Sequence, residues 1–117
     1  MSSRAWGDLG EDNVCAHLAQ QGIEVLDRNV RLAHGELDIV AREGETYVFI
    51  EVKTRTSARF GTPAEAVDSR KRRRILSAAT CYAAMHGWMD CRIRFDIIEQ
   101  TPGKIRHIKG AFDASGK

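Results

Sequence analysis

The spacing of apolar residues between about positions 8 and 21 predicts an α-helix, because they recur every three to four positions. Gly22 follows the last of them and marks the expected end of the helix. Glu11 precedes Val14 by three positions and Leu18 by seven, so it shares the apolar face. A carboxylate there is unusual, since a buried charge needs a partner or a metal ion. The apolar face consists of Leu9, Val14, Cys15, Leu18 and Ala19.

A second helical pattern extends over residues 62–86. Thr62 fits the cap of this helix and Pro63 fits its first helical position. We expect a break in the helix near Asp68 and its end at Gly87. The face predicted to be buried consists of Ile75, Leu76, Ala79, Tyr82, Ala83 and His86.

Five segments have the extended or alternating character of β-strands. The second and third are joined by a short turn around Gly44, which predicts a hairpin. The order of helix, three strands, helix and two strands predicts an α/β domain with a central mixed five-stranded sheet flanked by helices. The predicted strands are residues 23–31, 36–41, 46–53, 91–100 and 104–109.

The composition is that of a globular domain, with 43% hydrophobic and 29% charged residues. The 117 residues suit a single domain over residues 1–117. The longest uncharged stretch, residues 75–89, is shorter than the about 20 apolar residues of a membrane span. Asp8 precedes any apolar run, so we expect no secretory signal, no membrane partner and a cytoplasmic location. Three cysteines without a CxxC pair predict buried thiols, with no disulfide or structural zinc: Cys15, Cys81 and Cys91.

Positive charge is concentrated in one part of the chain, although the formal net charge is only +2. Residues 70–74 form an unbroken basic run, and Arg55 and Arg59 precede it. Such a cluster is compatible with a phosphate-binding face, and equally with an exposed helix face that binds nothing. Arg72 lies three positions before Ile75, so we expect it to point toward the sheet and the rest of the run into solvent.

Two acids come together in the predicted hairpin. A two-residue turn at Glu43 and Gly44 would bring Asp38 opposite Phe49. Asp38 and Glu51 would then lie diagonally on one face, with their Cα atoms roughly 7–8 Å apart. Alternation along the later strand places Tyr47, Phe49, Glu51 and Lys53 on that face.

Neighbouring carboxylates repel each other unless a cation lies between them. Oxygen ligands favour Mg²⁺ or Mn²⁺ over zinc. Lys53 is not a ligand while protonated, but it can stabilise charge that develops on a phosphate or orient an attacking water. Carboxylates, a hard cation and a lysine together suit phosphodiester hydrolysis. The alternative is an exposed, salt-bridged face of the hairpin without catalytic function.

The segments GELDIV (residues 35–40) and FIEVKTR (residues 49–55) resemble the PD-(D/E)xK nuclease signature, with Leu37 in place of its proline. Over nearly its whole length the chain resembles the YraN family, small bacterial proteins predicted to be endonucleases. The other matching segments are residues 7–11, 28–29, 60–68, 70–73 and 94–96.

This resemblance implies a restriction-endonuclease-like fold, similar to that of archaeal Holliday-junction resolvases. It implies that Asp38, Glu51 and the helix-borne Glu11 bind Mg²⁺ or Mn²⁺ and act in catalysis. It also implies that Lys53 is the catalytic lysine. The residues predicted to contact nucleic acid are Arg55, Arg59, Arg70, Lys71, Arg72 and Arg73.

The predicted function is therefore a metal-dependent endonuclease acting on DNA, including branched or structured DNA. The alternative is a nucleic-acid-binding module that has this fold but no turnover. A third hypothesis is an interaction protein whose acids form a structural salt-bridge cluster. DNA is a better match than RNA, and a homodimer is compatible with the nuclease, since a four-way junction needs paired cuts.

Overall fold

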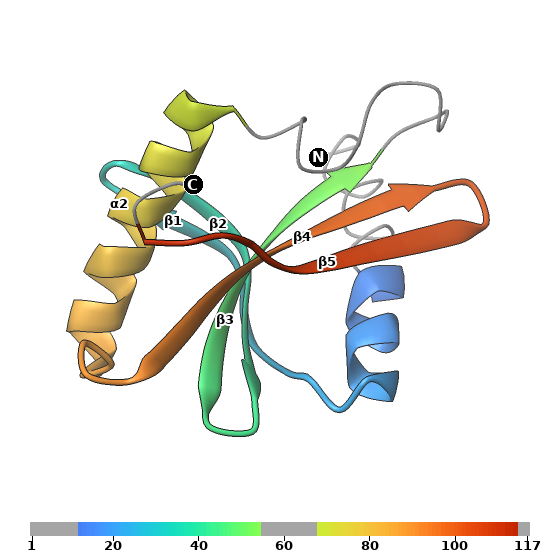
Figure 1. Ribbon diagram of the computed structural model, residues 1–117, viewed down its shortest axis with the longest axis horizontal. Helices are drawn as coiled ribbons and strands as arrows, with labels where there is room; N and C mark the ends of the chain where they lie inside the picture. The colour runs from blue at the N-terminus through green and yellow to red at the C-terminus, as the bar shows by residue number, and fades with distance from the viewer. Residues whose placement is uncertain (1–11, 55–67, 115–117) are drawn as a thin grey trace.

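The computed structural model describes residues 12–54 and 68–114, which form a sheet with a helix on each side (Figure 1). The first helix contains residues 12–20 and ends before Gly22, as predicted. No helix in these two ranges is long and apolar enough to cross a membrane. The other elements are β1 (Glu24–Leu32), β2 (Gly35–Glu43), β3 (Thr46–Thr54), α2 (Ser69–His86), β4 (Arg92–Thr101) and β5 (Lys104–Phe112).

The five strands form one sheet in the order β1-β2-β3-β4-β5. Neighbouring strands are antiparallel except β3 and β4, which are parallel. A parallel pair needs a crossover connection, and α2 lies in the segment that supplies it. The prediction of a mixed five-stranded sheet flanked by helices is confirmed.

Each face of the sheet has its own hydrophobic core. On β3, Phe49 packs on the side of α2, whereas Val48 and Ile50 pack on the side of the first helix, as alternation predicts. The α2 core contains Leu37, Val40, Phe49, Ile75, Ala78, Ala79, Tyr82, Phe95, Ile97 and Phe112. The other core contains Val14, Leu18, Ile23, Ile39, Ala41, Val48, Ile50 and Ile98.

Helix α2 ends where the sequence predicts, whereas the predicted start at Thr62 and Pro63 lies outside the described residues. Asp68 is extended, with φ −75° and ψ 175°, and its side chain caps α2 near the position where a break is predicted. Gly87 ends the helix in the left-handed conformation, with φ 74°. Ala78 joins the predicted buried face. His86 was wrongly assigned to it, because it is exposed, although its ring stacks on the Tyr82 ring.

The turn between β2 and β3 differs from the prediction by one residue. Glu43 pairs with Thr46, so Gly44 and Glu45 form the turn. Gly44 has φ 60° at the first turn position, where a type II′ hairpin turn requires glycine. The register therefore shifts by two residues, and Val40 lies opposite Phe49 where Asp38 was expected.

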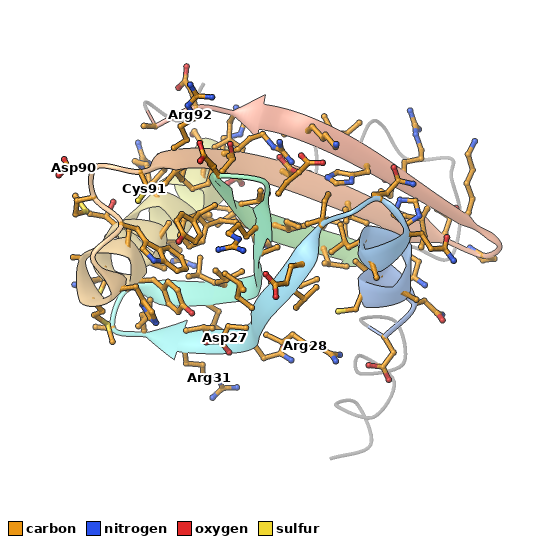
Figure 2. All side chains as sticks on the ribbon, turned by 90° about the horizontal axis from the view of Figure 1, so that it is seen from below. Asp27, Arg28, Arg31, Asp90, Cys91 and Arg92 are labelled. Carbon is orange, nitrogen blue, oxygen red and sulfur yellow. The ribbon has the colours of Figure 1, made fainter. Side chains whose placement is uncertain are left out.

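Strand β5 is longer than predicted because it continues through an irregularity at Gly110, which has φ 63°. A glycine in a strand often marks such a bulge. The expectation of buried thiols is wrong for two cysteines. Cys81 is exposed on α2, and Cys91 is exposed in the connection to β4, beside Asp90 and Arg92 (Figure 2).

Candidate metal and nucleic-acid site

Asp38 and Glu51 meet where β2 and β3 stop pairing. The last backbone pair is Ile39 with Ile50, and Asp38 and Glu51 are the next residues along the two strands. The Asp38 carboxylate accepts a hydrogen bond of 2.8 Å from the backbone N–H of Val52, one residue beyond Glu51. The two acids therefore lie close together where the pairing ends, and both line one cleft.

Where this pairing ends, the side chains of β2 also change the face of the sheet toward which they point. Leu37 packs in the α2 core together with Val40, although strict alternation would separate them. Leu37 and Ile39 therefore face opposite sides of the sheet. The change falls at Asp38, where β2 no longer has β3 as a backbone partner and can twist independently.

The Asp38 carboxylate is held in an unfavourable electrostatic environment. Burial and the nearby Glu51 carboxylate raise the pKa of Asp38 to about 7, although the hydrogen bond from Val52 opposes this. Glu51 is only 7% exposed. Carboxyl groups that are desolvated and close together bind a cation readily, since a cation relieves both costs.

Two lysines approach Glu51 from different elements. The Nζ of Lys71, on α2, lies 2.8 Å from Glu51 Oε1, and the Nζ of Lys53, on β3, lies 4.0 Å from the same oxygen. Burial and the adjacent Lys71 lower the pKa of Lys53. Burial also disfavours charge on Lys71, but its bond to Glu51 and the attraction of the two carboxylates outweigh this and raise its pKa.

Asp38, Glu51 and Lys71 border a cleft of about 540 Å³ between the sheet and α2. The strands contribute acids to the cleft and the first two turns of the helix contribute bases. An acidic wall that faces a basic wall suits a cation and a phosphate bound side by side. The described lining residues are Gly35, Glu36, Asp38, Glu51, Asp68, Arg70, Lys71, Arg74 and Ile75.

A close backbone contact brings the two walls together. A Cβ atom built on Gly35 would lie 3.0 Å from the carbonyl oxygen of Arg74. That separation is tighter than ordinary packing, so α2 can approach the start of β2 this closely because residue 35 is glycine. Gly35 therefore helps to set the width of the cleft.

The side chains of the basic run, residues 70–74, do not all point in the directions that the sequence predicts. Arg70 and Lys71 line the cleft, and their contact with nucleic acid stays a prediction. Arg72 faces the sheet as predicted, but its guanidinium lies 5.6 Å from the centre of the Phe112 ring, away from the acids. Arg73 is exposed. Lys71 was expected in solvent and instead bonds Glu51.

Arg74 is a cleft residue that the sequence interpretation missed. Its position was detectable, because it follows Arg70 by four residues and so lies on the same side of the helix. Glu36 also lines the cleft, and it pairs with Arg31 at 2.9 Å. Three predicted site residues lie outside the described residues: Glu11, Arg55 and Arg59.

The donor set at the cleft fits a hard divalent cation. Asp38 and Glu51 offer carboxylate oxygens, which Mg²⁺ and Mn²⁺ prefer. Within residues 12–54 and 68–114 no group of three or more His, Cys, Asp or Glu side chains is placed to hold a metal ion. The described part of the chain thus supplies two carboxylate ligands, and the predicted third, Glu11, lies outside it.

Asp96 is a second acid of the sheet, on the face of the first helix. Its fully buried carboxylate accepts hydrogen bonds from Arg94, at 2.9 and 3.0 Å, and from the Gly110 backbone, at 2.9 Å. His107 Nε2 lies 2.7 Å from Oδ2. Burial tends to raise the pKa of Asp96, but these bonds hold it below the usual range. Asp96 therefore holds the basic side chains of Arg94 and His107 in place.

Comparison with solved structures identifies the fold. The chain superposes on the Holliday junction resolvase Hjc of Archaeoglobus fulgidus with a TM-score of 0.53 and 21% sequence identity. The match covers 85% of this chain and 72% of that one. The predicted restriction-endonuclease-like fold is thereby confirmed.

Sequence comparison places the chain among bacterial relatives. It is 43% identical over 118 residues to a UPF0102 protein of Anaeromyxobacter dehalogenans, covering 97% of this chain and 88% of the relative. It is 45% identical over 113 residues to one of Frankia casuarinae, covering 92% and 96%. The profile of the uncharacterised protein family UPF0102 matches residues 10–99. The chain therefore belongs to the UPF0102 family, the YraN-type family that its motifs indicate.

Proposed function

We propose that this protein is a metal-dependent endonuclease that hydrolyses phosphodiester bonds in DNA. The main support is the cleft in which Asp38 and Glu51 face Arg70, Lys71 and Arg74. The acids suit a divalent cation, and the bases suit the phosphate that such a cation would activate. The fold that the chain shares with a Holliday junction resolvase agrees with this chemistry.

Asp38 and Glu51 would hold Mg²⁺ or Mn²⁺, and the resemblance adds Glu11 to them. The bound ion would polarise the phosphate and lower the pKa of an attacking water. The ion's charge would also keep Asp38 ionised at neutral pH, although the pKa of Asp38 is about 7 without it.

Lys53 would act on the scissile phosphate from β3. It lies beside Glu51, and only 24% of its side chain is exposed. Burial and the charge of Lys71 lower its pKa, so its proton is held less tightly than that of an exposed lysine. Such an ammonium group can stabilise charge developing on the phosphate and hold the attacking water in place.

The basic wall would bind the DNA backbone without regard to sequence. Arg70 and Arg74 lie one helical turn apart and both line the cleft. Guanidinium groups pair with phosphate oxygens through two parallel hydrogen bonds. The predicted contacts of Arg55 and Arg59 would extend this surface. Binding should therefore weaken steeply with salt.

The proposal includes branched DNA as the substrate and a homodimer as the active form. The structural neighbour is a Holliday junction resolvase, which supports a four-way junction as a candidate substrate. Two symmetrically placed cuts in a junction are most simply made by two copies of one site.

One observation favours the alternative of a binding module without turnover. The ammonium of Lys71 already lies 2.8 Å from Glu51, so a salt bridge neutralises part of the acidic wall. In that case the cleft would bind nucleic acid through Arg70 and Arg74 and cleave nothing.

Cleavage assays separate these two functions. Labelled four-way junction, flap, single-stranded and duplex DNA would be incubated with Mg²⁺ or Mn²⁺. Asp38→Asn and Lys53→Ala should each reduce cleavage by at least about a hundredfold while binding is retained. Glu45→Gln, which removes the same charge from the exposed β2–β3 turn, is the matched control and should cleave as the wild type does. Tight, salt-sensitive binding without cleavage by the wild type would favour the binding module.

A further inference from the structure

Lys71 is fixed at the edge of the cleft by the start of α2. Its backbone N–H donates a 2.9 Å hydrogen bond to the capping carboxylate of Asp68, which anchors the first helical turn. From that turn its side chain crosses to the sheet and reaches Glu51 at 2.8 Å. Lys53, which is only two residues from Glu51 on the same strand, comes no closer than 4.0 Å.

The two partners of this ion pair differ in their access to water. The side chain of Glu51 is 8% exposed, whereas that of Lys71 is 38% exposed. Glu51 has little water to replace the ammonium if it leaves. Lys71 can turn its charged end into the open cleft, since long basic side chains keep their stems packed while their heads move into water. Lys71 can therefore leave the ion pair readily once another cation neutralises the Glu51 carboxylate.

We propose that Lys71 is the resident cation of the metal-free site, and that a divalent cation bound by Asp38 and Glu51 displaces its ammonium from Glu51. This inference rests on the proposed metal-dependent function. Two cations at one carboxylate repel each other strongly where water is scarce. The displaced ammonium enters the cleft beside Arg70 and Arg74, on the wall proposed to bind phosphate. Lys71 is thus a positioning residue that holds the acids until the metal arrives.

Displacement has a measurable consequence for metal affinity. The divalent cation competes with Lys71 for Glu51, so removal of the ammonium should tighten metal binding. A purely structural salt bridge predicts the opposite, because its loss would disturb the two ligands. Arg73 provides the control, since it lies two residues further along the same helix, is exposed and carries the same charge.

The test compares Mn²⁺ binding to the wild type, Lys71→Met and Arg73→Met by isothermal titration calorimetry, without DNA. We expect Lys71→Met to lower the dissociation constant about tenfold, the effect of a charge within a few ångströms of the ion. Arg73→Met should stay within about twofold of the wild type, as an exposed charge screened by salt. The metal-free Lys71→Met protein should also melt at a lower temperature than the wild type.

The outcomes separate the inference from the proposed function. Unchanged or weaker Mn²⁺ binding by Lys71→Met, with binding by the wild type intact, overturns the role of Lys71 alone. Absence of Mn²⁺ binding in the wild type and in the variant overturns the metal site and this inference together. If Lys71→Met does not fold, Lys71→Gln keeps a hydrogen-bond donor for Glu51 without the charge and should give the same tightening.

Discussion

Asp38 and Asp96 are aspartates of one sheet whose surroundings have opposite effects. Asp96 is completely buried, yet its carboxylate is bonded by Arg94, His107 and the Gly110 backbone, and its pKa is lowered. Asp38 is half-buried, accepts one backbone hydrogen bond and faces another carboxylate, and its pKa rises to about 7.

The difference shows which acid serves stability and which is suited to function. The Asp96 carboxylate has neighbours that compensate its charge, and Arg94 extends the network to Glu43 at 2.7 Å. The charge of the Asp38 carboxylate is poorly compensated by its neighbours, and a bound cation would compensate it. Groups with strongly shifted pKa values cluster at functional sites because such sites are not optimised for stability alone.

The largest effect is expected from Asp96→Ala. It leaves Arg94 and the buried His107 without their shared anion, which should lower the free energy of unfolding by about 3–5 kcal/mol. Chemical denaturation at pH 7 measures it, with the exposed Asp90→Ala as control. Because the pKa of Asp96 is lowered, its stabilisation exists above its unfolded pKa and disappears as the pH falls through the folded value. A loss below about 1 kcal/mol would contradict a structural role.

Asp38→Asn should raise the free energy of unfolding of the metal-free protein, whereas Asp96→Ala should lower it. Well below pH 3.8 the Asp38 carboxyl is neutral in both folded and unfolded states and costs nothing. Its folded pKa of about 7 exceeds the ordinary 3.8, so wild-type stability falls as the pH rises between these values. Asparagine avoids this loss, and at pH 8 the variant should be more stable by about 4 kcal/mol.

Thermal unfolding of the two proteins in EDTA from pH 4 to pH 8 measures this difference. The control is Glu45→Gln, which should follow the wild type at every pH. A stability difference between Asp38→Asn and the wild type that is independent of pH would show that the Asp38 carboxyl is not in an unfavourable environment.

Gly35→Ala should damage the cleft and spare the Asp96 network. The added methyl group would meet the Arg74 carbonyl at 3.0 Å, so α2 must move away from β2. We expect a loss of about 2 kcal/mol in unfolding free energy, as for other overpacked sites. Mn²⁺ affinity should weaken as well, which calorimetry measures. Normal stability with normal affinity would mean that α2 adjusts without cost.

The smallest expected effect is stabilisation by the metal. At ten times its dissociation constant, Mn²⁺ should add about 1.4 kcal/mol to the wild type by mass action. Differential scanning calorimetry at pH 8 should show the rise in melting temperature for the wild type and for Arg73→Met, but not for Asp38→Asn. An equal rise in Asp38→Asn would place the ion elsewhere.

Much of the fold follows from local sequence signals. Alternation assigns Phe49 to one core and Ile50 to the other, because strand geometry leaves no other arrangement. Asp68 and Gly87 bound α2 through local capping chemistry. The proximity of Asp38 and Glu51 was also predictable, since a short turn joins their strands.

The details of the cleft depended on tertiary structure. The turn conformation at Gly44 set the register of the hairpin, whose pairing ends at Ile39 and Ile50, beside Asp38 and Glu51. The docking of α2 on Gly35 sent Lys71 toward Glu51 and Arg72 toward Phe112, although periodicity favoured Arg72 for the sheet side near the acids.

The sequence by itself determined which elements form, which faces are apolar and which acids can meet, because these depend on spacing along one chain or across one turn. Only the tertiary structure decided which base reaches Glu51 and why Asp38 and Asp96 differ. Those outcomes depend on the distance between α2 and the sheet and on which distant side chains solvate each carboxylate. Neither quantity is encoded in local periodicity.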